Sequence, residues 1–297
     1  MKGLFTFEGG EGAGKTTVIN LVSDMLDKNN INYISTREPG GVASAEAIRE
    51  VILNEDINGV TECLLFAAAR RQHLIEKVIP SIKNNNIVLM DRYLDSSLVY
   101  QGIARDLNAE GVFLINKLAI NNSEVKFSQD SINLYANDLA NLLTDNSDRF
   151  EHSVIGDKIL SIINNFSLDS ITILLLKSAV YFVNSKNNNI NNLSDKLYSI
   201  NDLVEKIIPN SKLFIPTITF ILDIQPEVGI ERIMSNSERE VNRLDKESID
   251  FHYKIRNGYL NVSQNLNKDR NYKILNADNS PDYLANEIFN MIVAQNG

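Results

Sequence analysis

The sequence predicts an α/β protein built on a parallel five-stranded sheet flanked by helices, with a helical subdomain inserted into the chain. Short apolar runs alternate with segments of helical periodicity, and several of these runs end in charged residues. Such alternation is typical of a parallel sheet covered by helices, with ligands bound at the carboxyl ends of the strands. One Asn-rich stretch, residues 121–211, departs from the alternation and contains only helix-like segments.

The first strand and the first helix are expected near the N-terminus. Residues 4–8 form a short apolar run, which the glycines between Gly9 and Gly14 bring to an end. Apolar residues at helical spacing begin after Lys15. The order of strand, glycine-rich turn and helix is the context that a phosphate-binding loop requires.

The remaining elements follow from similar runs. Strands are expected at residues 33–36, 87–90, 217–222 and 272–275, and helices at residues 45–53 and 62–83. The third strand is followed at once by Asp91 and Arg92. A fully apolar run that ends in charged residues is the pattern of a buried parallel strand whose carboxyl end contributes to a site.

Residues 121–211 are expected to interrupt a discontinuous domain formed by residues 1–120 and 212–297. Asn and Ser separate four helical segments in this insertion, at residues 131–143, 155–164, 170–183 and 195–208. The content of Leu and Ile is too high for a solvated linker, so we interpret the insertion as a helical subdomain. The sequence leaves open whether it binds a partner, stabilises the fold or has no role.

Composition and charge exclude several classes of protein. With 43% hydrophobic and 23% charged residues, the chain is neither disordered nor collagen-like. A net charge of -9 argues against an extended nucleic-acid surface, although a mononucleotide needs only a local basic cluster. No apolar run is long enough to span a bilayer, and the single Cys63 fits a reducing compartment. We therefore expect a cytoplasmic protein with neither nucleic-acid nor membrane partners.

Residues 9–16, GGEGAGKT, match the pattern G-x-x-x-x-G-K-[ST]. Glycines allow successive backbone N–H groups to face a phosphate, and the helix N-terminus adds positive potential. Lys15 can place its charge between the β- and γ-phosphates, and Thr16 offers a hydroxyl ligand for Mg²⁺. The loop thus predicts a bound nucleoside triphosphate with Mg²⁺, and we assign to this site Gly9, Gly10, Glu11, Gly12, Ala13, Gly14, Lys15, Thr16 and Thr17.

Three charged residues allow two interpretations each. Glu11 adds negative charge to a phosphate-binding loop. Its side chain either faces solvent, or it accepts a hydrogen bond from a hydroxyl of the acceptor substrate or positions a charged partner. Asp91 and Arg92 either form a structural ion pair or serve a site, in which Asp91 holds Mg²⁺ through water and Arg92 neutralises phosphate.

Further motifs follow the loop along the chain. They are TREPGG at residues 36–41, LFAAARRQHL at 65–74, DRYLDSSLVYQG at 91–102, NRLD at 242–245 and NAD at 276–278. In order and spacing they resemble the motifs of the bacterial thymidylate kinases, over about residues 1–120 and 213–293 and most closely the Gram-positive form. The resemblance implies a P-loop NTPase-type three-layer fold and transfer of the γ-phosphoryl group of ATP to dTMP, in dTTP biosynthesis. It also implies a homodimer, whose interface the insertion could block or reshape.

The resemblance implies roles for individual residues. Phe66 stacks on the thymine ring, and Tyr100 packs against the sugar where a ribonucleotide would carry its 2′-hydroxyl. The residues implied to contact dTMP are Glu38, Pro39, Arg49, Phe66, Arg70, Arg92, Ser96, Ser97, Tyr100 and Gln101. Arg37 is a further candidate for the acceptor phosphate, and Asn276 and Ala277 lie on the adenine side.

The catalytic residues implied by the resemblance are Lys15, Arg92, Glu11, Arg239 and Arg243. The last two lie in a polar segment, residues 235–247, which we interpret as a lid over the phosphates; a solvated charged helix is the alternative. The attacking group is already an anion, so no general base is expected beyond the phosphate oxygen.

Two other functions are compatible with parts of the sequence. Another nucleoside monophosphate kinase, or a deoxynucleoside kinase, would share the loop and the Asp91–Arg92 pair but should have a different set of base-contacting residues. A catalytically silent nucleotide-binding protein would have no chemical need of Lys15 and Arg92. Turnover with different monophosphates distinguishes these alternatives.

Overall fold

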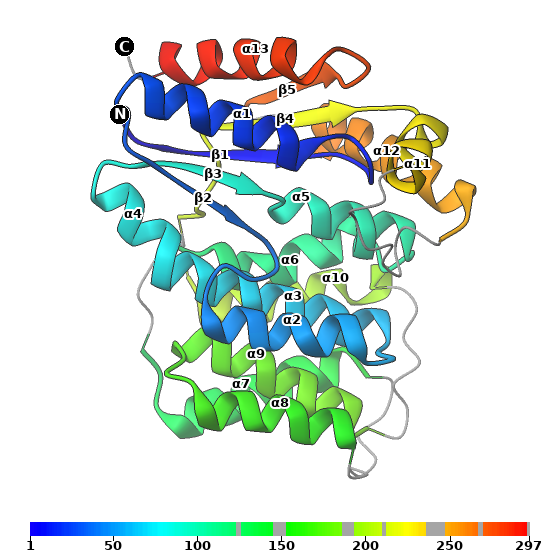
Figure 1. Ribbon diagram of the computed structural model, residues 1–297. Helices are drawn as coiled ribbons and strands as arrows, with labels where there is room; N and C mark the ends of the chain where they lie inside the picture. The colour runs from blue at the N-terminus through cyan, green and yellow to red at the C-terminus, as the bar shows by residue number, and fades with distance from the viewer. Residues whose placement is uncertain are drawn as a thin grey trace. The chain divides into compact units, whose positions relative to one another are not determined.

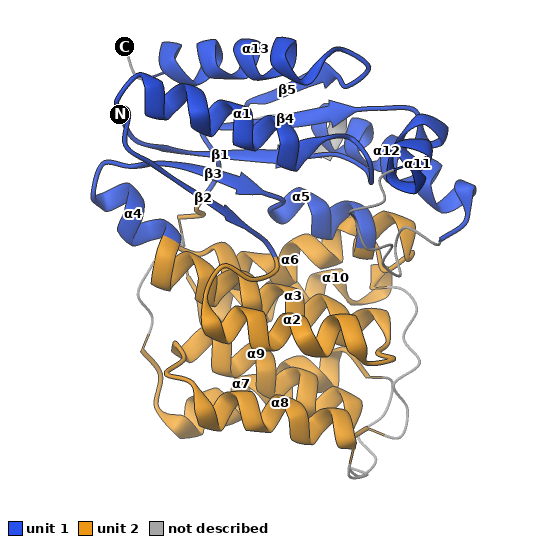
Figure 2. Cartoon of the chain, in the orientation of Figure 1, with its two compact units in different colours: residues 1–38, 78–100, 215–297 blue, residues 39–77, 101–214 orange. Residues whose placement is uncertain are grey.

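The computed structural model describes residues 1–122, 126–144, 153–185, 193–209, 212–235, 247–266 and 270–295. The chain forms two compact units (Figure 2). Residues 1–38, 78–100 and 215–297 form the sheet unit, and residues 39–77 and 101–214 form the helical unit. The helical unit therefore combines inserted residues with others that precede the insertion. The boundaries expected from sequence, residues 121–211 against the rest, stay a prediction.

Five parallel strands form the sheet unit's core layer, in the order β2-β3-β1-β4-β5. The strands are β1 (Gly3–Glu8), β2 (Tyr33–Arg37), β3 (Ile87–Asp91), β4 (Ile218–Asp223) and β5 (Tyr272–Asn276). The predicted five-stranded parallel sheet is confirmed. Because β1 lies between β3 and β4, the loop that follows β1 begins beside the carboxyl ends of both neighbours, and Phe7 pairs with Asp91 across β1 and β3.

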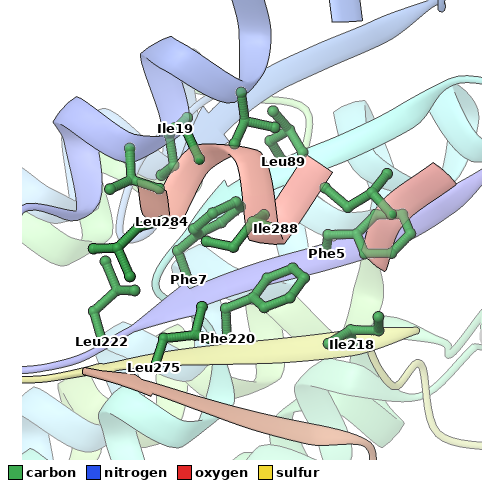
Figure 3. Packing of buried hydrophobic residues seen from close by; sticks show 14 of the residues in the cluster. Phe5, Phe7, Ile19, Leu89, Ile218, Phe220, Leu222, Leu275, Leu284 and Ile288 are labelled. Atoms are coloured by element: carbon green, nitrogen blue, oxygen red, sulfur yellow. The ribbon is translucent and has the colours of Figure 1, made fainter. Parts of the chain in front are cut away.

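Helices α1 (Lys15–Lys28) and α13 (Pro281–Ala294) pack together over one face of the sheet (Figure 1). Apolar side chains from β1, β4 and these helices meet beneath them, among them Phe7, Phe220 and Ile288 (Figure 3). The rings of Phe7 and Phe220 lie 5.4 Å apart between centroids. Burial of each such side chain stabilises the fold by roughly 1.5–3 kcal/mol, so β1 and the start of its loop are held firmly.

Further helices complete the sheet unit. They are α4 (Ile79–Lys83), α5 (Leu94–Ser97), α11 (Pro226–Met234), α12 (Ile249–Asn261) and the π-helical turn η5 (Val262–Leu266), while a second π-helical turn, η2 (Leu98–Ala104), leads from this unit into the helical one. Helix α5 follows the carboxyl end of β3 directly, which is why the residues after Asp91 belong to the site.

The helical unit consists of α2 (Ala43–Asn54), α3 (Gly59–His73), α6 (Ala109–Ile120), α7 (Gln129–Leu142), α8 (Val154–Asn165), α9 (Ser170–Val183), the 3₁₀ turn η3 (Ser194–Lys196) and α10 (Leu197–Ile207). The four helices predicted for the insertion are confirmed within two residues at each end. Helix α9 packs against α3, α7 and α8, and this burial on several sides explains its largely apolar sequence. Within the described ranges, no helix has both the length and the apolar character needed to cross a membrane.

One long α-helix was expected at residues 62–83. These residues are helical, but their hydrogen bonding is not α-helical throughout. Helix α3 ends at His73, a π-helical turn, η1 (Leu74–Val78), follows, and α4 begins at Ile79. Pro80 has no N–H to donate to the carbonyl four residues earlier, and a π turn is a common way for a helix to accommodate such a break.

Candidate active site

The loop after β1 depends on glycine at two positions. At Gly12, φ is 74°, and a Cβ there would lie 2.0 Å from the carbonyl oxygen of Gly229. At Gly9, φ is 140°, and a Cβ would lie 2.5 Å from the carbonyl oxygen of Leu222. Any other residue would combine backbone strain with a steric clash at either position. At these two glycines the loop is therefore seated directly against β4 and α11.

Lys15, the first residue of α1, has its ammonium group within the loop. The Nζ atom donates to the carbonyl oxygens of Gly9 at 2.9 Å and Gly10 at 3.0 Å. Burial, together with the nearby Arg92 charge, lowers the pKa of Lys15 to about 8. A bound polyphosphate would offer this partly desolvated cation stronger acceptors than two neutral carbonyls.

Thr16 and Asp91 form the part of the site that fits Mg²⁺. The Thr16 hydroxyl donates to Asp91 Oδ2 at 3.3 Å, and Asp91 stands at the end of β3. The other carboxylate oxygen, Oδ1, is buried and has no hydrogen-bond partner in the described residues. The described residues contain no group of three His, Cys, Asp or Glu side chains able to hold a metal. A hydroxyl and one carboxylate, completed by phosphate oxygens and water, match the way in which proteins hold Mg²⁺ with nucleotides.

Arg92 adopts an unusual backbone conformation directly after β3. Its φ is 68°, a left-handed value that costs a residue with a Cβ roughly 1–2 kcal/mol. Its N–H donates to the Phe7 carbonyl at 2.9 Å, which ties this turn to β1. The strained turn directs the guanidinium to the loop, where Nη1 lies 3.4 Å from the Gly9 carbonyl oxygen.

The Arg92 guanidinium is held by an acid and two tyrosines. Nη2 pairs with Glu11 Oε1 at 3.1 Å, and Nη1 donates to the hydroxyls of Tyr100 and Tyr259, each at 3.2 Å. The guanidinium carbon also lies 5.1 Å from the centre of the Tyr100 ring, within cation–π range. This fixed cation is suited to neutralising phosphate charge.

Glu11 is not a solvent-facing loop residue, because only 7% of it is exposed. Besides Arg92, it accepts from the Tyr100 hydroxyl at 2.6 Å, and its second oxygen lies 3.7 Å from His252 Nδ1. Burial alone would raise the pKa of Glu11, but His252, Arg92, Lys15 and Tyr100 together hold this pKa well below its usual range. Glu11 is therefore an anion that orders the cations around it.

A second carboxylate, Glu8, lies at the end of β1 and is completely buried. It accepts from the Tyr93 N–H and the Ser96 hydroxyl, both at 2.7 Å, and from the Tyr259 hydroxyl at 3.1 Å. Burial and the nearby Asp95 raise the pKa of Glu8 to about 7, against the opposing effects of Ser96 and Arg92. Tyr259 and Ser96 also accept hydrogen bonds from Arg92, so Glu8 helps to fix the arginine indirectly, through these two hydroxyls.

Sequence reasoning did not identify Glu8, Tyr259 or His252 as part of this site. Tyr259 and His252 lie on α12, whose pattern gives them no distinction from ordinary buried residues. The available signal was the position of Glu8 directly before the glycine-rich loop.

The residues predicted for the adenine side lie at the carboxyl end of β5, where Asn276 is the last residue of the strand and Ala277 follows it. The N–H of Ala277 donates to the Asp223 carbonyl at 2.8 Å, and the Ala277 carbonyl accepts from Arg232 at 3.0 Å. Arg256 holds the Asp223 carboxylate through two hydrogen bonds of 2.7 and 2.9 Å. The turn containing Asn276 and Ala277 is thus fixed against the end of β4.

The helical unit carries other predicted residues. Phe66 is half-buried, although every other residue of α3 from Val60 to His73 is buried. Arg70 is buried and donates to Asn116 of α6, and Arg49 of α2 donates to the Pro39 carbonyl at 3.1 Å. Phe66 therefore has the one ring on this stretch of α3 that a ligand can reach.

The structure distributes the predicted residues as follows. The sheet unit brings together Glu11, Lys15, Thr16, Asp91, Arg92, Ser96 and Tyr100. Ser97 is buried on α5, Glu38 donates its N–H to the Asp91 carbonyl at 2.9 Å, and Thr17 is exposed on α1. The predicted lid, with Arg239 and Arg243, lies outside the described residues except at its ends.

Comparison with known proteins gives consistent results. A family model described as thymidylate kinase matches residues 7–127 and 193–288. The thymidylate kinase of Clostridium novyi (strain NT) is 34% identical over 291 residues, which cover 97% of this chain and 97% of that protein. The thymidylate kinase of Geobacillus sp. (strain WCH70) is 34% identical over 298 residues, which cover 99% and 96%. The crystal structure of thymidylate kinase from Ehrlichia chaffeensis superposes with a TM-score of 0.52 at 18% identity, covering 97% of each chain, and this likeness concerns the fold alone.

The parallel sheet, the glycine-rich loop on β1 and the lysine that opens α1 define a P-loop nucleotide-binding protein. Within this class, the match to the family model and the 34% identity over nearly the whole chain show that the chain belongs to the thymidylate kinase family, a family of phosphotransferases.

Proposed function

We propose that this protein transfers the γ-phosphoryl group of ATP to the 5′-phosphate of dTMP, giving dTDP for dTTP biosynthesis. The observation that carries the proposal is the 34% identity to a thymidylate kinase over 97% of the chain. The chain also has the phosphate-binding loop with Lys15 and an Arg92 side chain held by Glu11. Phosphoryl transfer between two nucleotides requires positioning and charge neutralisation, with little covalent chemistry from the protein.

On the donor side, we assign the phosphates of ATP to the loop and the adenine to the turn after β5. The backbone N–H groups of the loop and the N-terminus of α1 provide positive potential for the β-phosphate. Lys15 exchanges the carbonyls of Gly9 and Gly10 for phosphate oxygens when ATP binds. Asn276 and Ala277 contact the adenine edge, held in place by Asp223 and Arg232.

Mg²⁺ is proposed as the cofactor, since Thr16 and Asp91 fit it. Thr16 would be a direct ligand, and Asp91 would act through water with the oxygen that lacks a protein partner in the described residues. When bound, the ion supplies neutralisation of the β- and γ-phosphate charges.

On the acceptor side, Arg92 is assigned to the 5′-phosphate, with Arg37 and Arg49 as further cations. The attacking phosphate oxygen is an anion and needs a cation to approach the γ-phosphate. Glu11 and Tyr100 hold Arg92 in its position before substrate binds, so its charge needs no reorganisation during the reaction. Glu11 can also accept a hydrogen bond from an acceptor hydroxyl.

The thymidine part of dTMP is assigned to an aromatic surface and a few polar groups. Phe66 stacks on the base, Tyr100 packs against the sugar, and the remaining assigned contacts are Glu38, Pro39, Arg70, Ser96, Ser97 and Gln101. We further propose that Arg239 and Arg243 close over the phosphates and that the protein is a homodimer. Light scattering of the purified protein tests the second point, and a monomer at micromolar concentration would refute it.

A coupled ADP-release assay tests the function. The purified protein is incubated with ATP, Mg²⁺ and each of dTMP, dUMP, dCMP, dGMP and AMP. We expect the highest kcat/KM with dTMP, weaker turnover of dUMP and little of the others. Preference for any acceptor other than dTMP or dUMP would identify a different nucleotide kinase, and absence of ADP release with every acceptor would favour a silent nucleotide-binding protein.

A further inference from the structure

Three residues of α3 lie on one stripe of the helix. Glu62, Phe66 and Arg70 follow each other at intervals of four, so their side chains project from the same face. Phe66 is the half-buried member, whereas Glu62 and Arg70 are 3% and 2% exposed. A buried carboxylate one turn from a partly accessible aromatic ring is costly unless it is paired, and its partners therefore indicate its role.

Glu62 contacts two residues of the turn η2 and the segment that follows it. Its Oε1 atom accepts a hydrogen bond from Gln101 Nε2 at 2.7 Å and lies 3.3 Å from Arg105 Nε. Gln101 is itself buried, with 3% of its surface exposed. The side chain of Arg105, which forms an ion pair with Glu62, is 26% exposed. The Gln101 amide is thus held between a helix and a turn.

The carboxylate fixes which way the amide faces. A side-chain amide has an NH₂ donor and a carbonyl acceptor on the same carbon, and an ionised carboxylate only accepts. Turning the Gln101 amide over would place Oε1 against Glu62, two acceptors in a buried position. With Nε2 committed to Glu62, the group left in a fixed position is the acceptor Oε1, which has no hydrogen-bond partner in the part of the chain that the structure describes.

We propose that Glu62 is a specificity-determining positioning residue, which holds the Gln101 amide so that Oε1 accepts a hydrogen bond from a base with an N–H at N3. The proposal rests on the function proposed above, in which Gln101 is one of the residues that contact dTMP. Thymine and uracil carry N3–H, whereas N3 of cytosine is an acceptor. A cytosine at the same place would face Oε1 with like polarity, and buried polar groups left unpaired produce strong discrimination between substrates.

The 5-methyl group provides an internal control. Thymine and uracil share N3–H and differ at carbon 5, so an amide fixed by Glu62 distinguishes cytosine from both and does not distinguish them from each other. Loss of the carboxylate should therefore change the preference for dTMP over dCMP and leave the preference for dTMP over dUMP as it was. A general loosening of the structure would have no reason to change one ratio and spare the other.

The test compares the full-length protein with its Glu62→Gln variant. The values of kcat/KM are measured for dTMP, dUMP and dCMP, and the inhibition constant of dCMP against dTMP replaces turnover where turnover is too slow. A glutamine at position 62 can donate as well as accept, so both orientations of the Gln101 amide become populated. We expect the preference for dTMP over dCMP to fall by about 10-fold to 100-fold, mainly through KM, while the preference for dTMP over dUMP changes less than about twofold.

Two further variants complete the experiment. Glu205→Gln removes another carboxylate of the same unit, one with a 47% exposed side chain paired with Lys117, and should change neither ratio. If Glu62→Gln does not fold, the double variant Glu62→Met, Arg105→Gln removes the acceptor and its paired cation together and leaves no charge uncompensated at this pair; the same loss of preference is expected.

A folded variant of either kind that keeps the wild-type preference against dCMP overturns the proposal. If the wild-type protein itself prefers dCMP, or phosphorylates none of the three, the proposed function is refuted instead.

Discussion

The Tyr100 hydroxyl donates to Glu11 Oε1 at 2.6 Å, and the same oxygen receives Arg92 Nη2 at 3.1 Å. Burial raises the pKa of Tyr100 well above its ordinary value, so this hydroxyl keeps its proton and remains a donor. Glu11, in the phosphate-binding loop, thereby holds Arg92, which follows β3 and lies 81 residues further along the chain. The loop and the cation after β3 are one preorganised cluster.

We expect Glu11→Gln to lower kcat for dTMP on the order of 100-fold, because a neutral amide no longer fixes the Arg92 charge where the phosphates meet. Tyr100→Phe keeps the carboxylate and removes one of its donors, so the loss in kcat should be smaller, about 3-fold to 10-fold. Steady-state kinetics measures both, and near-UV circular dichroism confirms that each variant is folded. A Glu11→Gln enzyme with wild-type kcat would mean that Arg92 needs no anchor.

Lys15→Met should lower kcat on the order of 1000-fold while the protein stays folded. Lys15 is buried, and its unbranched stem is close in shape to Met, so the substitution removes the charge with little loss of packing. The charge is the one positioned to compensate the phosphates during transfer. Lys28→Met, at the exposed end of α1, is the matched control and should leave kcat unchanged. Retention of more than a tenth of the activity by Lys15→Met would contradict the role assigned to Lys15.

Stability should fall as pH rises from about 5 to 8 because of Glu8. Burial raises the pKa of its carboxyl to about 7 in the folded protein, whereas the unfolded value is the ordinary one near 4.5. Between these two values the folded protein binds more protons than the unfolded chain, so the free energy of unfolding decreases with rising pH and becomes level above about pH 8. The full difference is on the order of 3 kcal/mol.

Urea unfolding of the wild type and of Glu8→Gln at pH 5 and pH 8 measures this effect. The amide does not titrate, so the variant should lack the part of the pH dependence that Glu8 contributes. Parallel pH profiles in the two proteins would show that Glu8 does not titrate in this range.

The parts of the fold that sequence predicted are those encoded locally. Strands β1, β3 and β4 were visible as apolar runs, and the loop was visible because its glycines and Lys15 lie within a few residues of each other. The partnership of Glu8 with Tyr259 spans 251 residues, and no local pattern distinguishes a tyrosine that reaches a buried carboxylate from one that fills a core. The break at Pro80 was readable from the missing N–H, but the helical periodicity on both sides concealed it.

The same limit applies to the insertion. Its helices were predicted from periodicity, but what they pack against was not. Helix α9 lies against α3, the helix that carries Phe66 and Arg70, and Arg71 of α3 pairs with Asp169 at the start of α9, 98 residues away. The family model leaves residues 128–192 unmatched, and Asp169 lies among them. A residue outside the matched ranges, Asp169, thus pairs with the buried charge of Arg71, which lies on a helix inside those ranges.

Asp169→Ala should lower the free energy of unfolding by roughly 3–5 kcal/mol, the usual cost of leaving one member of a buried ion pair without the other. The Arg71 side chain is fully buried, and its Nε lies 3.0 Å from Asp169 Oδ2. Asp169 also caps α9, accepting from the Thr172 N–H at 2.8 Å, and loss of a cap by itself costs about 1 kcal/mol. Ser128→Ala, which removes the cap of α7 without any ion pair, is therefore the matched control and should show only the smaller loss.

The double variant Arg71→Leu, Asp169→Asn separates charge from packing. Asn is as good a helix cap as Asp, and Leu fills part of the space with an apolar group, so this protein should regain most of the stability that Asp169→Ala loses. Urea denaturation of the wild type, of Arg71→Leu, of Asp169→Asn and of the double variant gives the coupling energy of the pair. If Asp169→Ala cost no more than Ser128→Ala, the contact between α3 and α9 would depend on apolar packing alone, and the buried charge pair would contribute nothing to it.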